Sequence, residues 1–283
     1  MSGFDDGGMA PPPPPPPSAG GGGAIPQRGL GDILTAAFEL YRANAAKLIQ
    51  IVAIVVIPLT FIMALLTQVA FKQHCDAAHV NSLSDLANNC TVSFGRSLLI
   101  SAITYFIAVA IQQLLIGALT RGAAGALIGR DVDVSASYQY AFSRLGPLIG
   151  LALLVALVVG VGFILLVIPG IIFLVFLAVS VPAFIIERLG VTDSMSRSWK
   201  LVSGSWWHTL AVIFVAAIIA GVINGILTAI GGNTFFGAWI LSAIAQIITA
   251  PFVALVSVVL YVDLRARHES LNAGTLATDL DRA

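Results

Sequence analysis

The chain has 283 residues, of which 58% are hydrophobic and only 10% are charged, and its mean hydropathy is +0.96. About a quarter of the residues of a soluble domain are charged, so this composition excludes an ordinary soluble fold and indicates a chain that is mostly in contact with lipid. The 14 basic and 14 acidic residues cancel, which gives no indication of nucleic-acid binding.

Residues 1–29 form a low-complexity segment in which Pro11–Pro17 is an unbroken proline run and Gly20–Gly23 follows it. Such a segment has too few apolar side chains to form a core, so we predict a disordered tether. The alternative is that Pro11–Pro17 docks into a proline-binding protein partner. Asp5 and Asp6 stand where a basic, apolar signal sequence would be expected, so we expect no export signal.

Six uncharged apolar stretches are predicted to cross the membrane as helices, because about 20 apolar residues span a bilayer core about 30 Å thick. They cover residues 48–71, 97–120, 145–167, 170–186, 209–230 and 236–262. The third and fourth belong to Leu145–Ile186, where Pro169 and Gly170 predict a tight turn between two antiparallel spans. The predicted fold is therefore an all-α membrane domain over residues 30–268, followed by a cytoplasmic tail over 269–283.

Three polar segments that lead into a pair of spans have the apolar periodicity of an amphipathic helix. They begin near Asp32, Asp133 and Asp193. We predict interfacial helices, and one interpretation is that an approach helix followed by a hairpin is repeated three times. The alternative is that any loop entering a span looks amphipathic at its boundary. Within the third segment, Asp193 and Arg197 have the i,i+4 spacing of a helical ion pair.

The basic residues predict how the chain is oriented in the membrane. Six spans place both termini on one side, and if that side is cytoplasmic, only Lys72 and Arg96 of the 14 lysines and arginines lie outside. Cytoplasmic loops carry an excess of Lys and Arg. We therefore predict a multi-pass protein with both termini in the cytoplasm.

Cys75 and Cys90 are the only two cysteines, and both lie in the predicted outer loop between Lys72 and Arg96. The outer side of the membrane is oxidising, so we predict a disulfide. Free thiols remain an alternative. A metal site with His74 and His79 is a further one, although the spacing matches no familiar zinc pattern.

An aromatic and basic belt is predicted at the cytoplasmic face. Tryptophan favours the depth of the lipid headgroups, and basic side chains are attracted to anionic ones. The candidate headgroup contacts are Arg197, Trp199, Lys200, Trp206, Trp207, Arg265 and Arg267. Simple anchoring at the interface would explain the same residues.

Four polar residues lie at membrane depth within the predicted spans: Gln112, Gln113, Asn224 and Gln246. No span carries an ionisable residue at its centre, as a proton- or ion-coupled transporter usually requires. We therefore predict that the four residues form hydrogen bonds between helices, with a polar permeation path as the alternative. No cofactor site, metal site or catalytic set is recognisable.

Three phrases together resemble a known family. The first is Leu30-Gly31-Asp32-Ile33-Leu34 leading to Leu40-Tyr41-Arg42, the second is Glu187-Arg188-Leu189-Gly190 leading to Ser196-Arg197-Ser198-Trp199-Lys200-Leu201, and the third is Tyr261-Val262-Asp263-Leu264-Arg265-Ala266-Arg267-His268-Glu269. They are similar to the membrane-domain family of glycerophosphoryl diester phosphodiesterases, in its stand-alone bacterial form with a proline/glycine-rich N-terminus. The resemblance implies a bacterial plasma-membrane location. It does not bring enzymatic activity, because the catalytic barrel of the fused proteins needs more residues than the polar tails contain.

Two functions remain open on these observations. The first is a non-enzymatic scaffold or lipid-interacting bundle, favoured by the resemblance and by the aromatic and basic belt. The second is a transporter or channel-like protein for a neutral or amphiphilic solute, which would use the four polar residues and the proline kinks.

Overall fold

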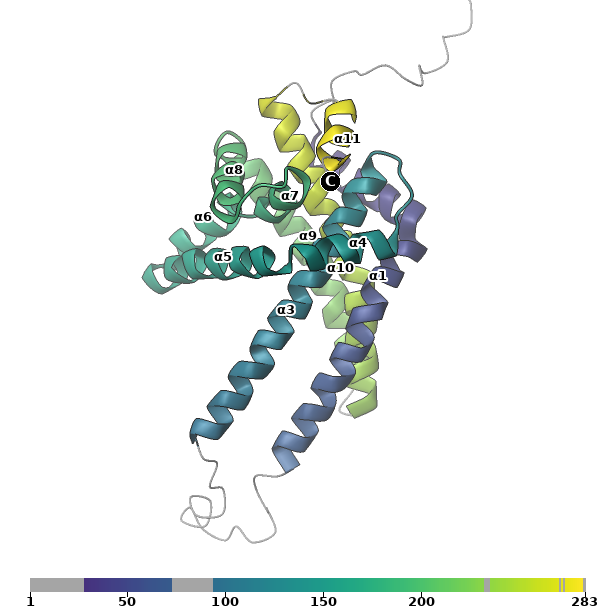
Figure 1. Ribbon diagram of the computed structural model, residues 1–283, viewed down its shortest axis with the longest axis vertical. Coiled ribbons are helices and arrows are strands. Elements are labelled where there is room, and N and C mark those ends of the chain that lie inside the picture. Colours follow the sequence, from purple (N-terminus) through teal and green to yellow (C-terminus); the bar gives the residue numbers. More distant parts are fainter. Residues whose placement is uncertain (1–27, 73–93, 232–234, 270, 272, 282–283) are drawn as a thin grey trace, which may run out of the picture.

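The computed structural model describes residues 28–72, 94–231, 235–269, 271 and 273–281. These residues form helices and contain no strand, which confirms the predicted all-α class. The helices are α1 Leu30–Lys72, α3 Phe94–Leu127, α4 Val134–Ser143, α5 Leu145–Leu165, α6 Val167–Phe176, α7 Ser180–Ile186, α8 Val191–Ser203, α9 Trp206–Gly231, α10 Phe235–His268 and α11 Ala273–Asp281 (Figure 1). The proline run Pro11–Pro17, Cys75 and Cys90 lie outside the described residues.

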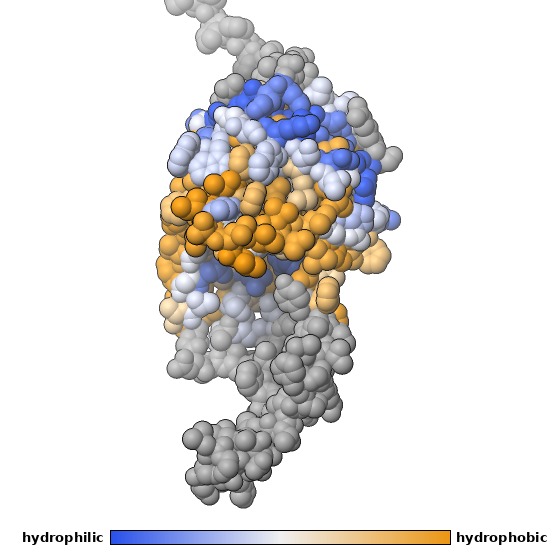
Figure 2. All heavy atoms as spheres, turned by 90° about the vertical axis from the view of Figure 1, so that its left-hand side faces the viewer, coloured by the Kyte–Doolittle hydropathy of each residue, from blue (hydrophilic) through white to orange (hydrophobic). Residues whose placement is uncertain are grey.

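Six helical segments in the described part of the chain are long and apolar enough to cross a membrane. They are Leu30–Ile62, Phe106–Leu127, Leu145–Leu165, Val167–Ile186, Trp206–Ile230 and Trp239–His268. Seen from the side of the α5–α6 hairpin, apolar residues form a broad band beneath a polar end (Figure 2). These features are those of a multi-pass membrane protein.

Each of the three expected approach segments is helical. The first is the beginning of α1, which is two helices joined at Asn44 (φ −118°, ψ 16°). The Asn44 side-chain amide donates to Leu40 O at 3.2 Å, and such local hydrogen bonds compete with the helical pattern. The second is α4, where Asp133 caps the helix by accepting from the Ala136 amide at 3.1 Å. The third is α8.

An approach helix followed by a hairpin therefore recurs three times along the chain, but the three units do not share one direction. The apolar part of α1 runs along the long axis of the molecule together with α3, α9 and α10, whereas α5 runs across it (Figure 1). The middle hairpin consequently projects from the side of the bundle at its polar end.

The bend between α5 and α6 lies at Leu166, which has extended backbone (φ −164°, ψ 155°). The predicted turn at Pro169-Gly170 is therefore misplaced. Pro169 is the third residue of α6, where the missing amide hydrogen costs nothing because the first turn of a helix has no acceptor for it. Gly170 serves close packing instead: a Cβ on Gly162 would lie 2.9 Å from Gly170 Cα, and one on Gly170 would lie 2.5 Å from the Phe163 ring.

Two apolar clusters hold the helices together. The larger one runs through α1, α3 and α10 and includes Ile33, Leu48 and Tyr261 among its fully buried side chains. The smaller one joins α5 to α7 through Leu148, Leu151, Phe184 and Ile185. The base of the crosswise hairpin is thus fixed by its own cluster, whereas its tip has no such support among the described residues.

Candidate functional site

An ion-pair network around Glu187 lies where α7, α8, α10 and α11 meet. Glu187, at the end of α7, accepts from Arg197 Nε at 2.9 Å and from the hydroxyl of the buried Tyr261. Arg197 also contacts Glu269 Oε1, at 2.5 Å. Arg265 completes the network, with its Nε 3.0 Å from Glu269 Oε2 and its NH1 2.8 Å from Asp279 Oδ2.

These contacts set the ionisation of Glu269. Partial burial of its carboxyl group opposes ionisation, but hydrogen bonds from Arg197 and Arg265 outweigh this, so the pKa of Glu269 lies below its ordinary value. The network therefore holds Glu269 as a carboxylate throughout the physiological pH range.

A second polar cluster, around Asp263, joins the two ends of the membrane domain. The Asp263 side chain is fully buried and accepts from Arg267 Nε at 2.7 Å and from the Arg28 amide at 2.6 Å. Arg267 in turn donates to Arg28 O at 2.6 Å, and His208 Nε2 lies 3.4 Å from Asp263. The start of α1 and the end of α10 therefore lie at the same end of the bundle. We call the Glu187 and Asp263 clusters together the polar cap.

The structure divides the seven predicted headgroup contacts into two groups. Arg197, Arg265 and Arg267 direct their guanidinium groups at carboxylates of the protein itself, and Trp206 packs partly buried against the core. Their predicted role as headgroup contacts gains no support from this arrangement. The other three side chains, Trp199, Lys200 and Trp207, are exposed.

We call the exposed group of Trp199, Lys200 and Trp207 the tryptophan surface. Trp199 stacks on Phe176 of α6 with ring centroids 4.0 Å apart, and Ser198 Oγ donates to Phe176 O at 2.7 Å. Trp207, at the start of α9, is 77% exposed. The packing of α8 on α6 thus holds the Trp199 ring against the hairpin.

The tip of the hairpin is the most exposed apolar segment in the described chain. The five consecutive residues from Ile164 to Ile168 are all exposed, and Ile164 reaches 85%. Soluble proteins rarely expose such a continuous apolar patch, but a membrane covers it with hydrocarbon.

Of the four predicted intramembrane polar residues, Asn224 contacts a neighbouring helix. Its side-chain amide donates to Ala220 O at 2.8 Å and lies 3.4 Å from Thr249 Oγ1 of α10. Gln112 and Gln246 are exposed on the outside of the bundle, and Gln113 is half-buried. The cavities beside the loop that precedes α4 are lined by none of these four residues.

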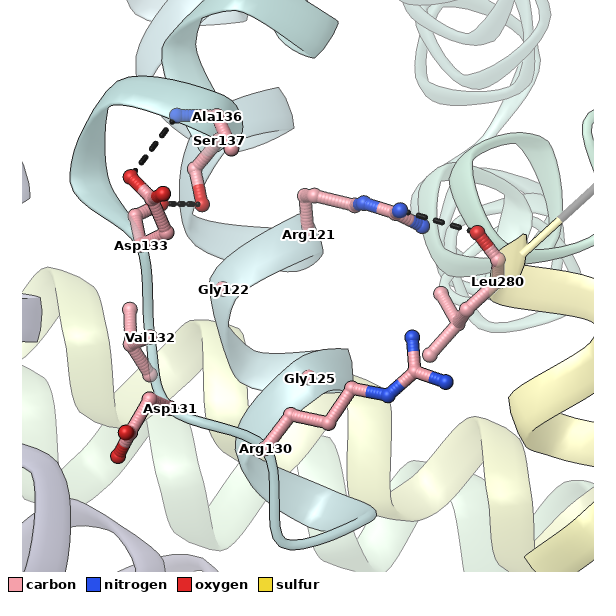
Figure 3. Close-up of a pocket in the computed structure, with 10 residues that line it drawn as sticks. All are labelled: Arg121, Gly122, Gly125, Arg130, Asp131, Val132, Asp133, Ala136, Ser137 and Leu280. Carbon is pink, nitrogen blue, oxygen red and sulfur yellow. Dashed lines mark hydrogen bonds between the residues drawn. The ribbon is translucent and has the colours of Figure 1, made fainter. Parts of the chain in front are cut away.

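Arg121 of α3 and Arg188 of the α7–α8 link place their guanidinium groups against the ring of Tyr140, with Cζ atoms 4.9 and 5.1 Å from its centroid. Arg121 also lines a cavity of ≈ 240 Å³ with Arg130, Gly122, Gly125 and Leu280. In Figure 3 the guanidinium groups of Arg121 and Arg130 extend toward Leu280, whereas the Asp131 and Asp133 carboxylates lie on the other side of the cavity. We call this region the arginine pocket.

Sequence reasoning did not identify Glu187, Asp263, Tyr140 or the pairing of Arg121 with Arg188 as parts of a site. Glu187, Arg197, Tyr261 and Asp263 belong to the second and third phrases that carry the family resemblance, and the structure brings these two phrases together in the polar cap. The occurrence of these residues in the same phrases was the sequence signal that could have indicated the polar cap. No sequence signal indicated the contact of Arg121 with Tyr140, because the two residues lie far apart in the sequence.

Comparison of the chain with protein-family models, with curated proteins and with solved structures finds no match in any of the three. The class of the protein follows from its own features, which are six helices of membrane-spanning length and a polar cap at one end.

Proposed function

We propose that the protein is a non-enzymatic, multi-pass protein of the bacterial plasma membrane that binds anionic lipid beside its α5–α6 hairpin. The observation that carries the proposal is the tryptophan surface, in which Trp199, Lys200 and Trp207 are exposed and Trp199 stacks on Phe176 of the hairpin helix α6. The family resemblance of the three phrases supports the same class of protein, and the distribution of lysine and arginine along the chain supports a cytoplasmic location for the polar cap.

The hairpin tip and the tryptophan surface each match one layer of a membrane. The tip residues Ile164–Ile168 are apolar and suit the hydrocarbon, whereas indole rings favour the headgroup region. A lysine near an anionic surface contributes about 1 kcal/mol to membrane association. The stacking of Trp199 on Phe176 links the hairpin to α8, so both elements engage the membrane surface as one unit.

The proposal is tested by counting the lipids that stay bound to the purified protein in native mass spectrometry. We expect the wild type to retain phosphatidylglycerol in preference to phosphatidylcholine when both are supplied. A W207A/K200Q variant should lose this preference. As a matched control, F142A/K47Q removes an exposed aromatic residue of α4 and an exposed lysine of α1, and it should keep the preference. Equal retention of phosphatidylglycerol by W207A/K200Q and the wild type would refute the proposal.

A further inference from the structure

Both arms of the α5–α6 hairpin are attached to α8. On one arm, the Phe176 ring of α6 stacks on the Trp199 ring of α8. On the other arm, Leu151 of α5 belongs to the smaller apolar cluster, against which Met195 of α8 packs. The depth of α8 in the membrane therefore sets the depth at which both arms of the hairpin begin.

Helix α8 marks the depth of the lipid headgroups. Its Trp199 and Lys200 are exposed, and its Arg197 pairs with Glu187 of the polar cap. Indole rings favour the headgroup layer, and charged side chains are costly in hydrocarbon, so α8 lies in the headgroup layer. This step rests on the proposed function, which places the tryptophan surface against the membrane.

Neither arm extends far enough beyond α8 to cross the bilayer. Helix α6 has 10 residues, so its far end at Val167 lies at most about 15 Å from Phe176. On the other arm, Val155 is the last residue of α5 that packs against the smaller cluster, and the helix continues for about 15 Å more before it ends at Leu165. Since the hydrocarbon core is about 30 Å thick, the tip of a hairpin that pointed straight into the membrane would reach only its middle.

The second half of the fourth apolar segment does not extend this reach. Helix α6 ends at Phe176, and α7 begins only at Ser180. Helix α7 is buried within the protein apart from the half-buried Val181, and Glu187 of the polar cap follows it directly. On this arm, only α6 is therefore left to enter the lipid.

The turn of the hairpin suits hydrocarbon better than water. No residue from Phe163 to Pro169 is polar, whereas turns in water are rich in Gly, Asn, Asp and Ser. The Leu166 amide donates to Gly162 O at 3.0 Å, and Leu166 O accepts from the Gly170 amide at 3.3 Å. Pro169 has no amide hydrogen to satisfy. These features lower the cost of placing the turn in lipid, where unpaired backbone groups are expensive.

We propose that α5–α6 is a re-entrant hairpin, which inserts into the hydrocarbon of one leaflet on the side of the polar cap, and that only α1, α3, α9 and α10 cross the bilayer. The partner of the hairpin is the acyl chains of that leaflet, which cover the exposed residues Ile164–Ile168. The crosswise course of α5 fits this depth, because the four other helices follow the long axis of the molecule (Figure 1). The predicted spans 145–167 and 170–186 are then two arms that enter and leave on the same side.

The test is the sidedness of chemical labelling at the tip, measured on the full-length protein in intact cells and in inside-out membrane vesicles. A C75S/C90S parent lacks the two native cysteines, and L166C then introduces a single thiol. We expect a membrane-impermeant maleimide to label L166C in neither preparation, and to label it once the protein is denatured. Labelling in intact cells would show a spanning hairpin, and labelling in the vesicles would show a tip in the cytosol. Either result would overturn the proposal.

Two control variants in the same parent calibrate the labelling. Ile230 is 69% exposed and lies about 36 Å along α9 from Trp206, beyond the hydrocarbon core, so I230C should react in intact cells. K200C, on the tryptophan surface, should react in the vesicles. Reversed reactivity of I230C and K200C would overturn the cytoplasmic location in the proposed function, whereas the result for L166C would still decide the hairpin.

A second measurement distinguishes insertion into lipid from burial in protein or aggregation. An environment-sensitive fluorophore on L166C, in protein reconstituted into liposomes, should be quenched at least twofold by lipids with spin-labelled acyl chains. Iodide in the aqueous phase should leave its emission unchanged. A fluorophore that neither quencher reached would lie inside protein, and this result would overturn the proposal.

Discussion

The backbone amide of Arg28 lies 2.6 Å from Oδ1 of Asp263, a residue 235 positions further along the chain. This contact joins the beginning of the first helix to the end of the last long one, inside a cluster where the Asp263 side chain is fully buried. Because a buried carboxylate is tolerated only when it is paired, the closure of the bundle depends on Arg267 and Asp263 together.

Replacing Asp263 with Ala should destabilise the protein by about 3 kcal/mol. This is the low end of the range for a broken buried ion pair, because 23% of the Arg267 side chain stays exposed to solvent. D263N should lose about half as much stability as D263A, because its side-chain amide oxygen still accepts a hydrogen bond from the Arg28 amide. Thermal unfolding in detergent, followed by tryptophan fluorescence, measures both. The control D193A, at an exposed residue, should shift the stability by less than about 0.5 kcal/mol.

Acid should weaken the polar cap through Glu269. The pKa of Glu269 is lower in the folded protein than in the unfolded chain, so its contribution to stability is complete above the unfolded pKa of about 4.3. That contribution disappears as the pH falls through the lower folded pKa. The difference in melting temperature between the wild type and E269Q should therefore be constant from pH 7 to pH 5 and shrink below pH 4.3. A difference that stayed constant down to pH 3 would contradict the assignment.

Alkali should weaken the contact between α4 and α1. Tyr138 donates a hydrogen bond to Ile51 O, and burial raises the pKa of Tyr138 from 10.0 to about 12. The raised pKa means that the stabilisation is complete below pH 10 and is lost as the pH rises toward 12. Y138F should be less stable than the wild type by about 1 kcal/mol at pH 8, for the lost hydrogen bond. This deficit should narrow by pH 11.5, and an unchanged deficit would show that the phenol does not titrate as described.

Close contact between glycines should limit substitution in the hairpin. A Cβ on Gly162 would lie 2.7 Å from the Phe173 ring and 2.9 Å from Gly170 Cα, so G162A should destabilise the protein by about 1–3 kcal/mol through overpacking. Gly160 lies in the same helix, and a Cβ there meets nothing within 4 Å. G160A should therefore be neutral or stabilising by up to about 1 kcal/mol. Equal melting temperatures for the two variants would argue against the described packing of α5 on α6.

Much of the fold could be predicted because membrane helices are encoded locally. Uncharged stretches of about 20 residues and the helical periodicity of the three approach segments depend only on neighbouring residues, and the structure contains helices at those places. The prediction of a turn at Pro169-Gly170 was wrong because proline is as acceptable in the first turn of a helix as in a tight turn. The bend lies at Leu166, where Gly162 packs closely on Gly170, a contact that the local sequence does not reveal.

The polar cap could not be predicted, because its pairs are distant in the sequence. Arg197 has the right spacing for Asp193, yet it pairs with Glu187 and Glu269, so the predicted i,i+4 pair is wrong. An exposed i,i+4 pair stabilises by only about 0.2–0.5 kcal/mol, which two better-placed carboxylates outweigh. For the same reason the spacing of Arg265 and Arg267 could not distinguish a headgroup contact from an internal ion pair.

The crosswise course of α5 makes the molecule broader at one end than at the other (Figure 1). In a bilayer whose normal follows the long axis of the bundle, the protein occupies more area in the leaflet on the side of the polar cap than in the opposite one. Lipids on that side must accommodate a wider perimeter. Such a shape is that of a wedge, which would be better accommodated where the membrane curves away from the polar cap than where it is flat.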